Sequence, residues 1–89
     1  MDKLVNASFH ILQIKFKGDD NKWFYSGKKG TKVSYCPNPT YAKHYLNTSG
    51  SKRAVKTIFE TFRNVEKVIY IYFDYKKMKF VDAYGKELK

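Results

Sequence analysis

The clearest structural signal in the chain is the run Ser49-Gly-Ser-Lys-Arg-Ala-Val-Lys-Thr-Ile-Phe-Glu-Thr-Phe-Arg63. Apolar side chains recur in it from Ala54 to Phe62 at the spacing of one stripe along an α-helix. Ser49 and Ser51 suit the start of such a helix, because a serine oxygen accepts a hydrogen bond from the free N–H groups of a first turn. The run therefore predicts an amphipathic helix on which a sheet packs.

The polar face of the predicted helix is mostly positive. Lys52 and Arg53 fall in its first turn, where the helix dipole already favours an anion over a cation. One interpretation is that a phosphate or another anion binds at this end of the helix. The alternative is a pair of solvated cations, which cost roughly a few tenths of a kcal/mol.

Further segments carry the alternation or the β-branched and aromatic residues that are typical of strands. They are residues 9–17, 22–26, 31–36, 68–75 and 78–83. Pro37 and Pro39 end the third of these segments, and a short helix is predicted for residues 40–46. The order β-β-β-α-α-β-β predicts a two-layer α+β domain, with an antiparallel sheet of about five strands and one main amphipathic helix packed on one face.

Length and composition indicate one folded domain spanning residues 1–89, with residues 1–8 as a loose N-terminal lead-in. Apolar residues make up 43% of the chain and aromatic residues 18%, so we expect a core built largely from rings. Cys36 is the single cysteine, which excludes an internal disulfide and fits a reducing cytosol. No run approaches the ~18 apolar residues of a membrane span. We expect a cytoplasmic protein of a bacterial host, without a membrane partner.

The charge is strongly positive and spread over the folded body. The chain has 18 Lys and Arg against 8 Asp and Glu, a net charge of +10. Each half carries +5 when the chain is divided after Tyr45. Such a domain repels itself, and usually either binds a polyanion or uses its charge for solubility. The predicted partner is a nucleic acid or a nucleoprotein effector complex, and an acidic protein surface is the other possibility.

The residues that commonly perform catalysis or bind metals do not form a recognisable set. His10, His44 and Cys36 lack metal-ligand spacing, and His10 is interpreted as a core or rim histidine. The aspartates and glutamates fit turns and solvated partners of lysine, and the chain has no glycine-rich nucleotide loop. We therefore predict no catalytic residue, no metal site and no cofactor, and a protein that is not an enzyme.

A basic surface with interleaved rings is the remaining candidate site. Lysine and arginine neutralise phosphates, while each unpaired base that stacks on a ring contributes about 1–3 kcal/mol. The alternative is that the tyrosines complete a small core, with their hydroxyls at its edge. The predicted binding residues are Lys28, Lys29, Lys32, Lys52, Arg53, Lys56, Arg63, Trp23, Tyr25, Tyr70 and Tyr72.

Tyr35, the run Ala42-Lys43-x-Tyr45-x-x-Thr48 and Ala54 give the chain a family resemblance over about residues 23–73. In this pattern it resembles small proteins encoded by phages and mobile elements of low-GC bacteria, anti-CRISPR proteins among them. The resemblance implies a protein that acts by occupying a surface of a host-defence complex. Many such inhibitors are acidic mimics of DNA, whereas this chain is basic, so contact with guide RNA, target DNA or an acidic effector groove fits it better.

Three hypotheses follow. The first is a non-enzymatic, basic, phage-type protein that inhibits or modulates a nucleic-acid-handling complex such as a CRISPR effector. The second is a small metal-independent ribonuclease-type toxin that uses Lys, Arg, Tyr and His10 or His44. The third is a virion-associated structural protein whose aromatic edge strand pairs between subunits.

Overall fold

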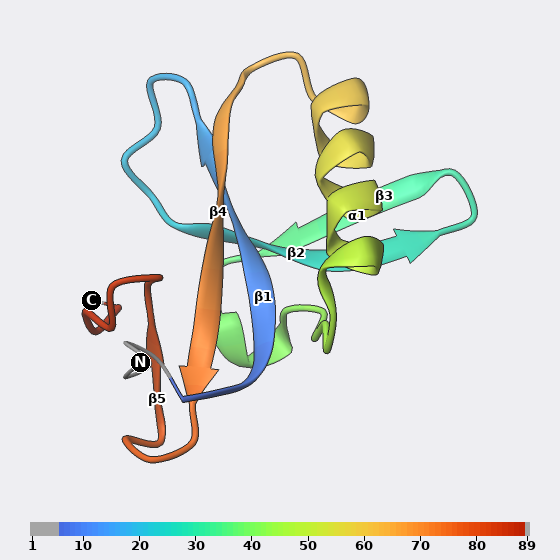
Figure 1. Ribbon diagram of the computed structural model, residues 1–89. Helices are drawn as coiled ribbons and strands as arrows, with labels where there is room; N and C mark the ends of the chain where they lie inside the picture. Colours follow the sequence, from blue (N-terminus) through green and yellow to red (C-terminus); the bar gives the residue numbers. More distant parts are fainter. Residues whose placement is uncertain (1–5, 89) are drawn as a thin grey trace.

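The centre of the fold is the pair of long strands β1 (Ala7–Phe16) and β4 (Val65–Asp74). The computed structural model describes residues 6–88, which form one antiparallel sheet of five strands in the order β3-β2-β1-β4-β5 (Figure 1). The predicted α+β class, with one main helix on one face of the sheet, is confirmed. The other elements are β2 (Trp23–Lys29), β3 (Lys32–Cys36), η1 (Pro39–Tyr41), α1 (Thr48–Thr61) and β5 (Lys79–Val81).

Alternating side chains of the central strands build a core on each face of the sheet. On the α1 side, Ala54 and Ile58 of the helix pack in one cluster with Leu12, Ile14 and Phe16 of β1. On the opposite side, the buried residues of the second cluster are Ile11, Phe24, Ala42 and Ile71. Leu88 packs against this second cluster, so the C-terminal segment covers part of the face opposite α1.

The β2–β3 hairpin extends beyond the rest of the sheet. β2 pairs with β1 at Trp23 and Phe24, whereas its pairing with β3 continues to Lys29 and Lys32. The hairpin therefore projects sideways beneath α1, on the right in Figure 1. Because β2 pairs with β1 at Gln13 and Ile14, the earlier part of β1 is left with a free edge on this side.

The free edge of β1 explains why the helix predicted for residues 40–46 is wrong. A 3-10 turn, η1, ends at Tyr41, and Tyr45 then pairs with His10 of β1. The two residues exchange backbone hydrogen bonds of 2.9 and 2.8 Å. Pairing with a strand edge satisfies the backbone groups that a second helical turn would otherwise have used.

The start of α1 also differs from the prediction. The N-cap is Asn47, whose side chain accepts a hydrogen bond from the Gly50 N–H. Ser51 is instead fully buried inside the helix. Because α1 begins at Thr48, Lys52 and Arg53 lie in its second turn, beyond the reach of the N-terminal dipole. The anion site predicted from their place in a first turn therefore loses that argument.

The two ends of the chain add smaller differences. β1 begins at Ala7, inside the predicted lead-in of residues 1–8, of which residues 1–5 lie outside the described part. β5 covers Lys79–Val81, shorter than the predicted strand of residues 78–83. Within residues 6–88, no helix combines the length and the apolar content that crossing a membrane requires.

Candidate functional site

The positive charge is concentrated in one continuous segment, residues 22–59. Residues 1–21 hold three lysines and three aspartates, and residues 60–89 hold seven cations and five acids. Residues 22–59 hold eight cations and no acid, and therefore carry +8 of the net charge of +10. The eight are Lys22, Lys28, Lys29, Lys32, Lys43, Lys52, Arg53 and Lys56.

The acid-free segment contributes to both faces of the sheet, because α1 packs on one face and Ala42, next to η1, packs on the other. It forms the β2–β3 hairpin, η1, the loop to the helix and most of α1; the hairpin tip and α1 lie on the right of Figure 1, and η1 lies near the centre. Lys22 is half-buried, and the other seven cations are exposed. The seven exposed cations lie on the hairpin, on the loop before α1 and on α1 itself, a concentration that a charge count by segment reveals and a count by halves misses.

An open depression of about 410 Å³ lies against the hairpin. We call it the hairpin depression, and its lining residues are Ser26, Gly27, Lys28, Lys29, Ser34 and Lys43. Its ammonium groups and hydroxyls are donors suited to the oxygens of a phosphate. Lys28 and Lys29 were predicted, whereas Lys43, Ser26 and Ser34 were not.

The backbone brings Lys43 to the hairpin. The Lys43 N–H donates to the Tyr25 carbonyl over 2.9 Å, which fixes the loop beside β2. Gly27 lies at an irregularity in the β2–β3 register with a φ of +122°, a conformation that glycine adopts readily. A Cβ at Gly27 would lie 3.8 Å from the Lys43 Cδ, so the lysine side chain passes directly over the glycine.

The other predicted cations lie at different distances from the depression. Lys32 pairs with Lys29 at the hairpin tip. Lys52, Arg53 and Lys56 are exposed on α1, which lies above the hairpin in Figure 1. Arg63 follows the end of α1, roughly 16 Å along the helix axis from Lys52, and belongs to the opposite end of the helix.

None of the four predicted rings lines the hairpin depression. Tyr25 is 3% exposed and belongs to the core, where burial raises the pKa of its phenol. Tyr70 and Tyr72 are half-buried on the α1 side of β4, and the Tyr70 hydroxyl accepts a hydrogen bond from Ser51. The structure therefore agrees with the alternative for Tyr25, a ring that completes the core and is closed to a base.

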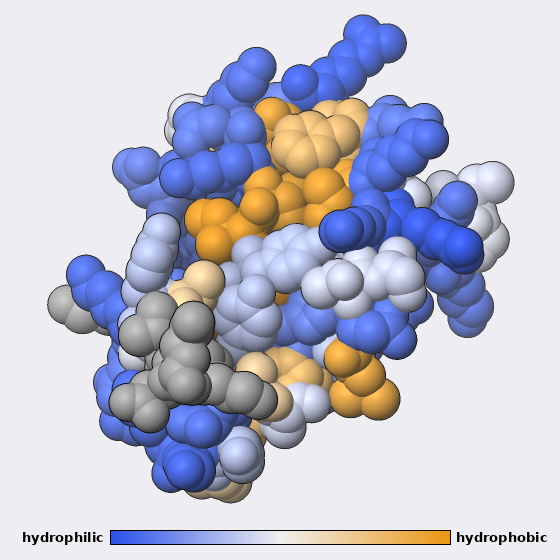
Figure 2. Space-filling view, viewed as in Figure 1, coloured by the Kyte–Doolittle hydropathy of each residue, from blue (hydrophilic) through white to orange (hydrophobic). Residues whose placement is uncertain are grey.

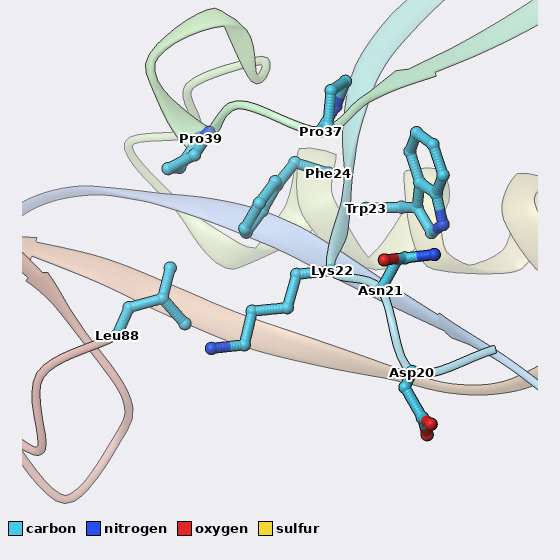
Figure 3. A pocket seen from close by; sticks show the side chains of 8 residues that line it. All are labelled: Asp20, Asn21, Lys22, Trp23, Phe24, Pro37, Pro39 and Leu88. Carbon is cyan, nitrogen blue, oxygen red and sulfur yellow. The ribbon is translucent and has the colours of Figure 1, made fainter.

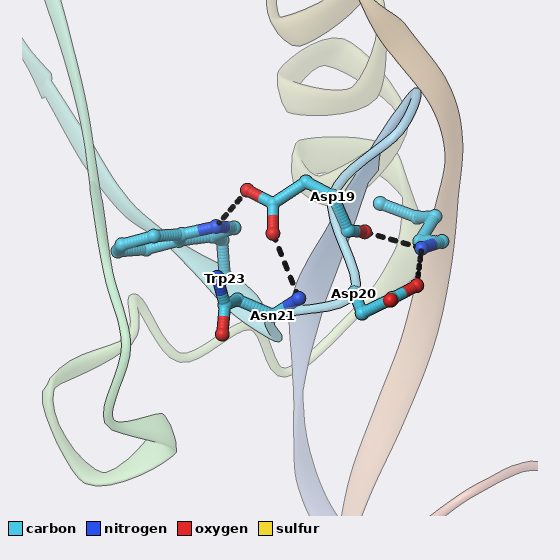
Figure 4. Close-up of polar contacts among 5 residues, drawn as sticks. Asp19, Asp20, Asn21 and Trp23 are labelled. Atoms are coloured by element: carbon cyan, nitrogen blue, oxygen red, sulfur yellow. Dashed lines mark hydrogen bonds and ion pairs between the residues drawn. The ribbon is translucent and has the colours of Figure 1, made fainter.

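Trp23 is held by a network at the far end of β2 (Figure 4). Its indole N–H donates to Asp19 over 3.0 Å, and the Asn21 N–H donates to the same carboxylate over 2.8 Å. The Asn21 N–H and the indole together hold the pKa of Asp19 below its usual range. Since Trp23 and Lys29 are six residues apart on one strand, roughly 20 Å separate the ring from the hairpin tip.

A second depression, of about 690 Å³, borders Trp23 and is separate from the hairpin depression (Figure 3). Pro37, Pro39 and Leu88 form its walls, and Phe24 lies beneath them with 1% of its surface exposed. Asp20 is also at its edge. Lys22 lines it as well, so the second depression has no excess of positive charge and suits a polyanion less well than the hairpin depression.

The two histidines occupy different environments. His10 is 5% exposed, and its Nε2 lies 2.8 Å from the Ser51 Oγ, with its ring stacked on Tyr70. His10 is therefore the core histidine that the sequence indicated, and burial lowers its pKa from the ordinary value of 6.5. His44 is exposed and stacks on Phe9 with 3.9 Å between ring centroids.

We expect acidification to destabilise the protein through His10. The folded state binds the proton less readily than the unfolded state, so the free energy of unfolding falls as the pH drops below about 6.5. The fall continues until the pH passes the lowered pKa of the folded state. Urea unfolding at intervals from pH 7.5 to 5 measures this slope, which His10→Gln should flatten. A wild-type slope unchanged by His10→Gln would contradict the prediction.

The fold and the hairpin depression thus define a small α+β domain with a phosphate-suited, cation-rich side. Among residues 6–88, no group of three or more His, Cys, Asp or Glu side chains is placed to hold a metal ion. No protein-family model, curated protein or solved structure matches the chain.

Proposed function

We propose that the protein binds nucleic acid through the hairpin depression and the neighbouring cations of α1. The observation that carries this proposal is the acid-free segment of residues 22–59, whose exposed cations lie on the hairpin, on the loop before α1 and on α1. Lys28, Lys29 and Lys43 lie around one depression with two serine hydroxyls, a set of donors that suits a sugar–phosphate backbone. Attraction to phosphates supplies affinity and carries little sequence information.

Phosphate contact supports this proposal better than base stacking does. Tyr25 lies in the core and Trp23 lies about 20 Å from the hairpin tip, so rings and lysines do not alternate along one path. The proposed mode is therefore electrostatic, with binding that depends on salt more than on base sequence.

The proposed role is non-enzymatic inhibition or modulation of a nucleic-acid-handling complex in a bacterial cytoplasm. The resemblance to small phage proteins supports it, because these proteins act by occupying a surface. By covering phosphates that an effector complex must contact, a domain of 89 residues blocks that contact without any chemistry of its own.

Titration with labelled single-stranded RNA, single-stranded DNA and duplex DNA of about 20 nucleotides, across a salt series, tests the proposal. We expect all three to bind at low salt, with log K falling linearly against log salt at a slope of about −3 for three to four contacted phosphates. Absence of binding at low salt, or a slope near zero, would contradict nucleic-acid binding. Shortened RNA products after incubation would instead favour the ribonuclease hypothesis.

A further inference from the structure

A strip of partly exposed apolar side chains lies between α1 and β4. We call it the α1–β4 strip, and it consists of Val55 and Phe59 from α1 with Val68 and Tyr70 from β4. Phe59 is 47% exposed, and the other three are half-buried. Figure 2 shows an apolar area where Figure 1 places α1 beside β4, with hydrophilic side chains along both flanks.

The geometry of α1 leaves this strip open. The helix buries Ser51, Ala54 and Ile58 against the sheet. At 3.6 residues per turn, Val55 and Phe59 point about 60° and 100° around the helix from Ile58. Both therefore lie on one flank of α1 and do not point straight at the sheet. On β4, Val68 and Tyr70 belong to the face that α1 covers, and this face continues to Tyr72. From Val68 to Tyr72 the exposed stretch is roughly 13 Å long.

The helix side of the strip is positive. Lys52 and Lys56 are exposed and lie about 20° and 60° around the helix from Phe59. Glu60 is farther round, at about 100° from Phe59. A partner that lies on Phe59 therefore meets ammonium groups at its edge.

We infer that the α1–β4 strip binds an acidic amphipathic helix of a partner protein. A helix placed in an apolar groove uses anchors one turn apart, and a stretch of roughly 13 Å accommodates about nine helical residues. Acidic side chains beside those anchors would face Lys52 and Lys56, which gives complementary charge at the rim. This inference shares Lys52 and Lys56 with the proposed nucleic-acid binding, but its apolar anchors lie outside the hairpin depression.

Other occupants fit the strip less well. A second copy of the chain, related by a twofold axis that crosses the strip at the lysine side, would bring Lys52 and Lys56 close to the same residues of its partner. Like charges placed together across an interface cost affinity. A nucleic acid would place charged phosphates over Val55, Phe59 and Val68, which offer them no donor. An acidic helix avoids both problems.

The test uses a synthetic 16-residue helical peptide with leucine one turn apart on one face and glutamate beside those leucines. A companion peptide carries lysine in place of each glutamate. We expect the glutamate peptide to bind and to shift the amide NMR signals of Val55, Phe59 and Val68, whereas the lysine peptide does not bind. Phe59→Ala should weaken binding by about tenfold or more, as for a central anchor. Tyr84→Ala, which truncates a ring 83% exposed elsewhere, should leave it unchanged.

A charge-swap variant keeps the inference testable even if Phe59→Ala fails to fold. In Lys52→Glu/Lys56→Glu, the preference should reverse, so that the lysine peptide binds and the glutamate peptide does not. Equal binding of both peptides to the wild type, or shifts confined to other residues, would overturn the inference. Two further results would overturn the inference. One is self-association in sedimentation together with changes in the amide NMR signals of the strip, and the other is a change in those signals when RNA is added. RNA binding alone, measured at the hairpin, reports separately on the proposed function.

Discussion

Replacing Ile58 with alanine is expected to lower the free energy of unfolding by about 2–5 kcal/mol. Ile58 is fully buried and is one of the α1 residues that hold the helix against the sheet. Its side chain belongs to the cluster that contains Leu12 and Ile14, so truncation leaves a cavity that a central sheet can fill only in part. Denaturant unfolding followed by circular dichroism measures the loss.

Phe59→Ala is the matched control, because it truncates the neighbouring residue of the same helix. Since Phe59 is 47% exposed, we expect a loss of about 1 kcal/mol. A domain of this size has a total stability of roughly 5–13 kcal/mol, so Ile58→Ala removes a large share of it while Phe59→Ala leaves the fold intact. Equal losses for the two variants would contradict the position of α1 on the sheet.

The fold could be predicted to the extent that it depends on periodicity. Alternation in β1 correctly placed Leu12, Ile14 and Phe16 on one face, and the helical stripe correctly placed Ala54 and Ile58. Local signals failed where several residues could do the same task. Asn47, Ser49 and Ser51 are all good N-cap residues, and Asn47 is the one that caps α1. The Ser51 hydroxyl instead contacts His10, which is 41 residues away along the chain, and no local signal indicates that contact.

The candidate site could be predicted by residue type more than by arrangement. Charge indicated Lys28 and Lys29 correctly as exposed neighbours. By contrast, β4 has apolar side chains on both faces, and this pattern does not tell which face the helix covers. Tyr70 therefore gave no sign that α1 lies over it. Lys43 was missed because a long-range backbone bond to Tyr25 brings it to the hairpin, and nothing local in the sequence indicates that bond.

Reversing the charges around the hairpin depression should abolish most nucleic-acid binding. In Lys28→Glu/Lys29→Glu/Lys43→Glu, three phosphate contacts are lost and three repulsive charges are added at one place. Charge-assisted hydrogen bonds contribute about 1.5–3 kcal/mol each, so we expect the affinity for single-stranded RNA to fall by at least about 100-fold. The residual binding should also have a salt slope closer to zero, because fewer counterions are released.

The matched control separates a localised surface from net charge. Lys67→Glu/Lys76→Glu/Lys86→Glu makes the same change in total charge on exposed lysines outside the acid-free segment. Beyond roughly 10 Å, salt at 0.1 M screens most of the attraction between such lysines and a bound phosphate, so we expect a loss of about fivefold or less. Fluorescence anisotropy with labelled RNA measures both variants, and thermal unfolding confirms that each is folded. If the two triple variants lose the same affinity, binding follows net charge, and the hairpin depression has no special part in it.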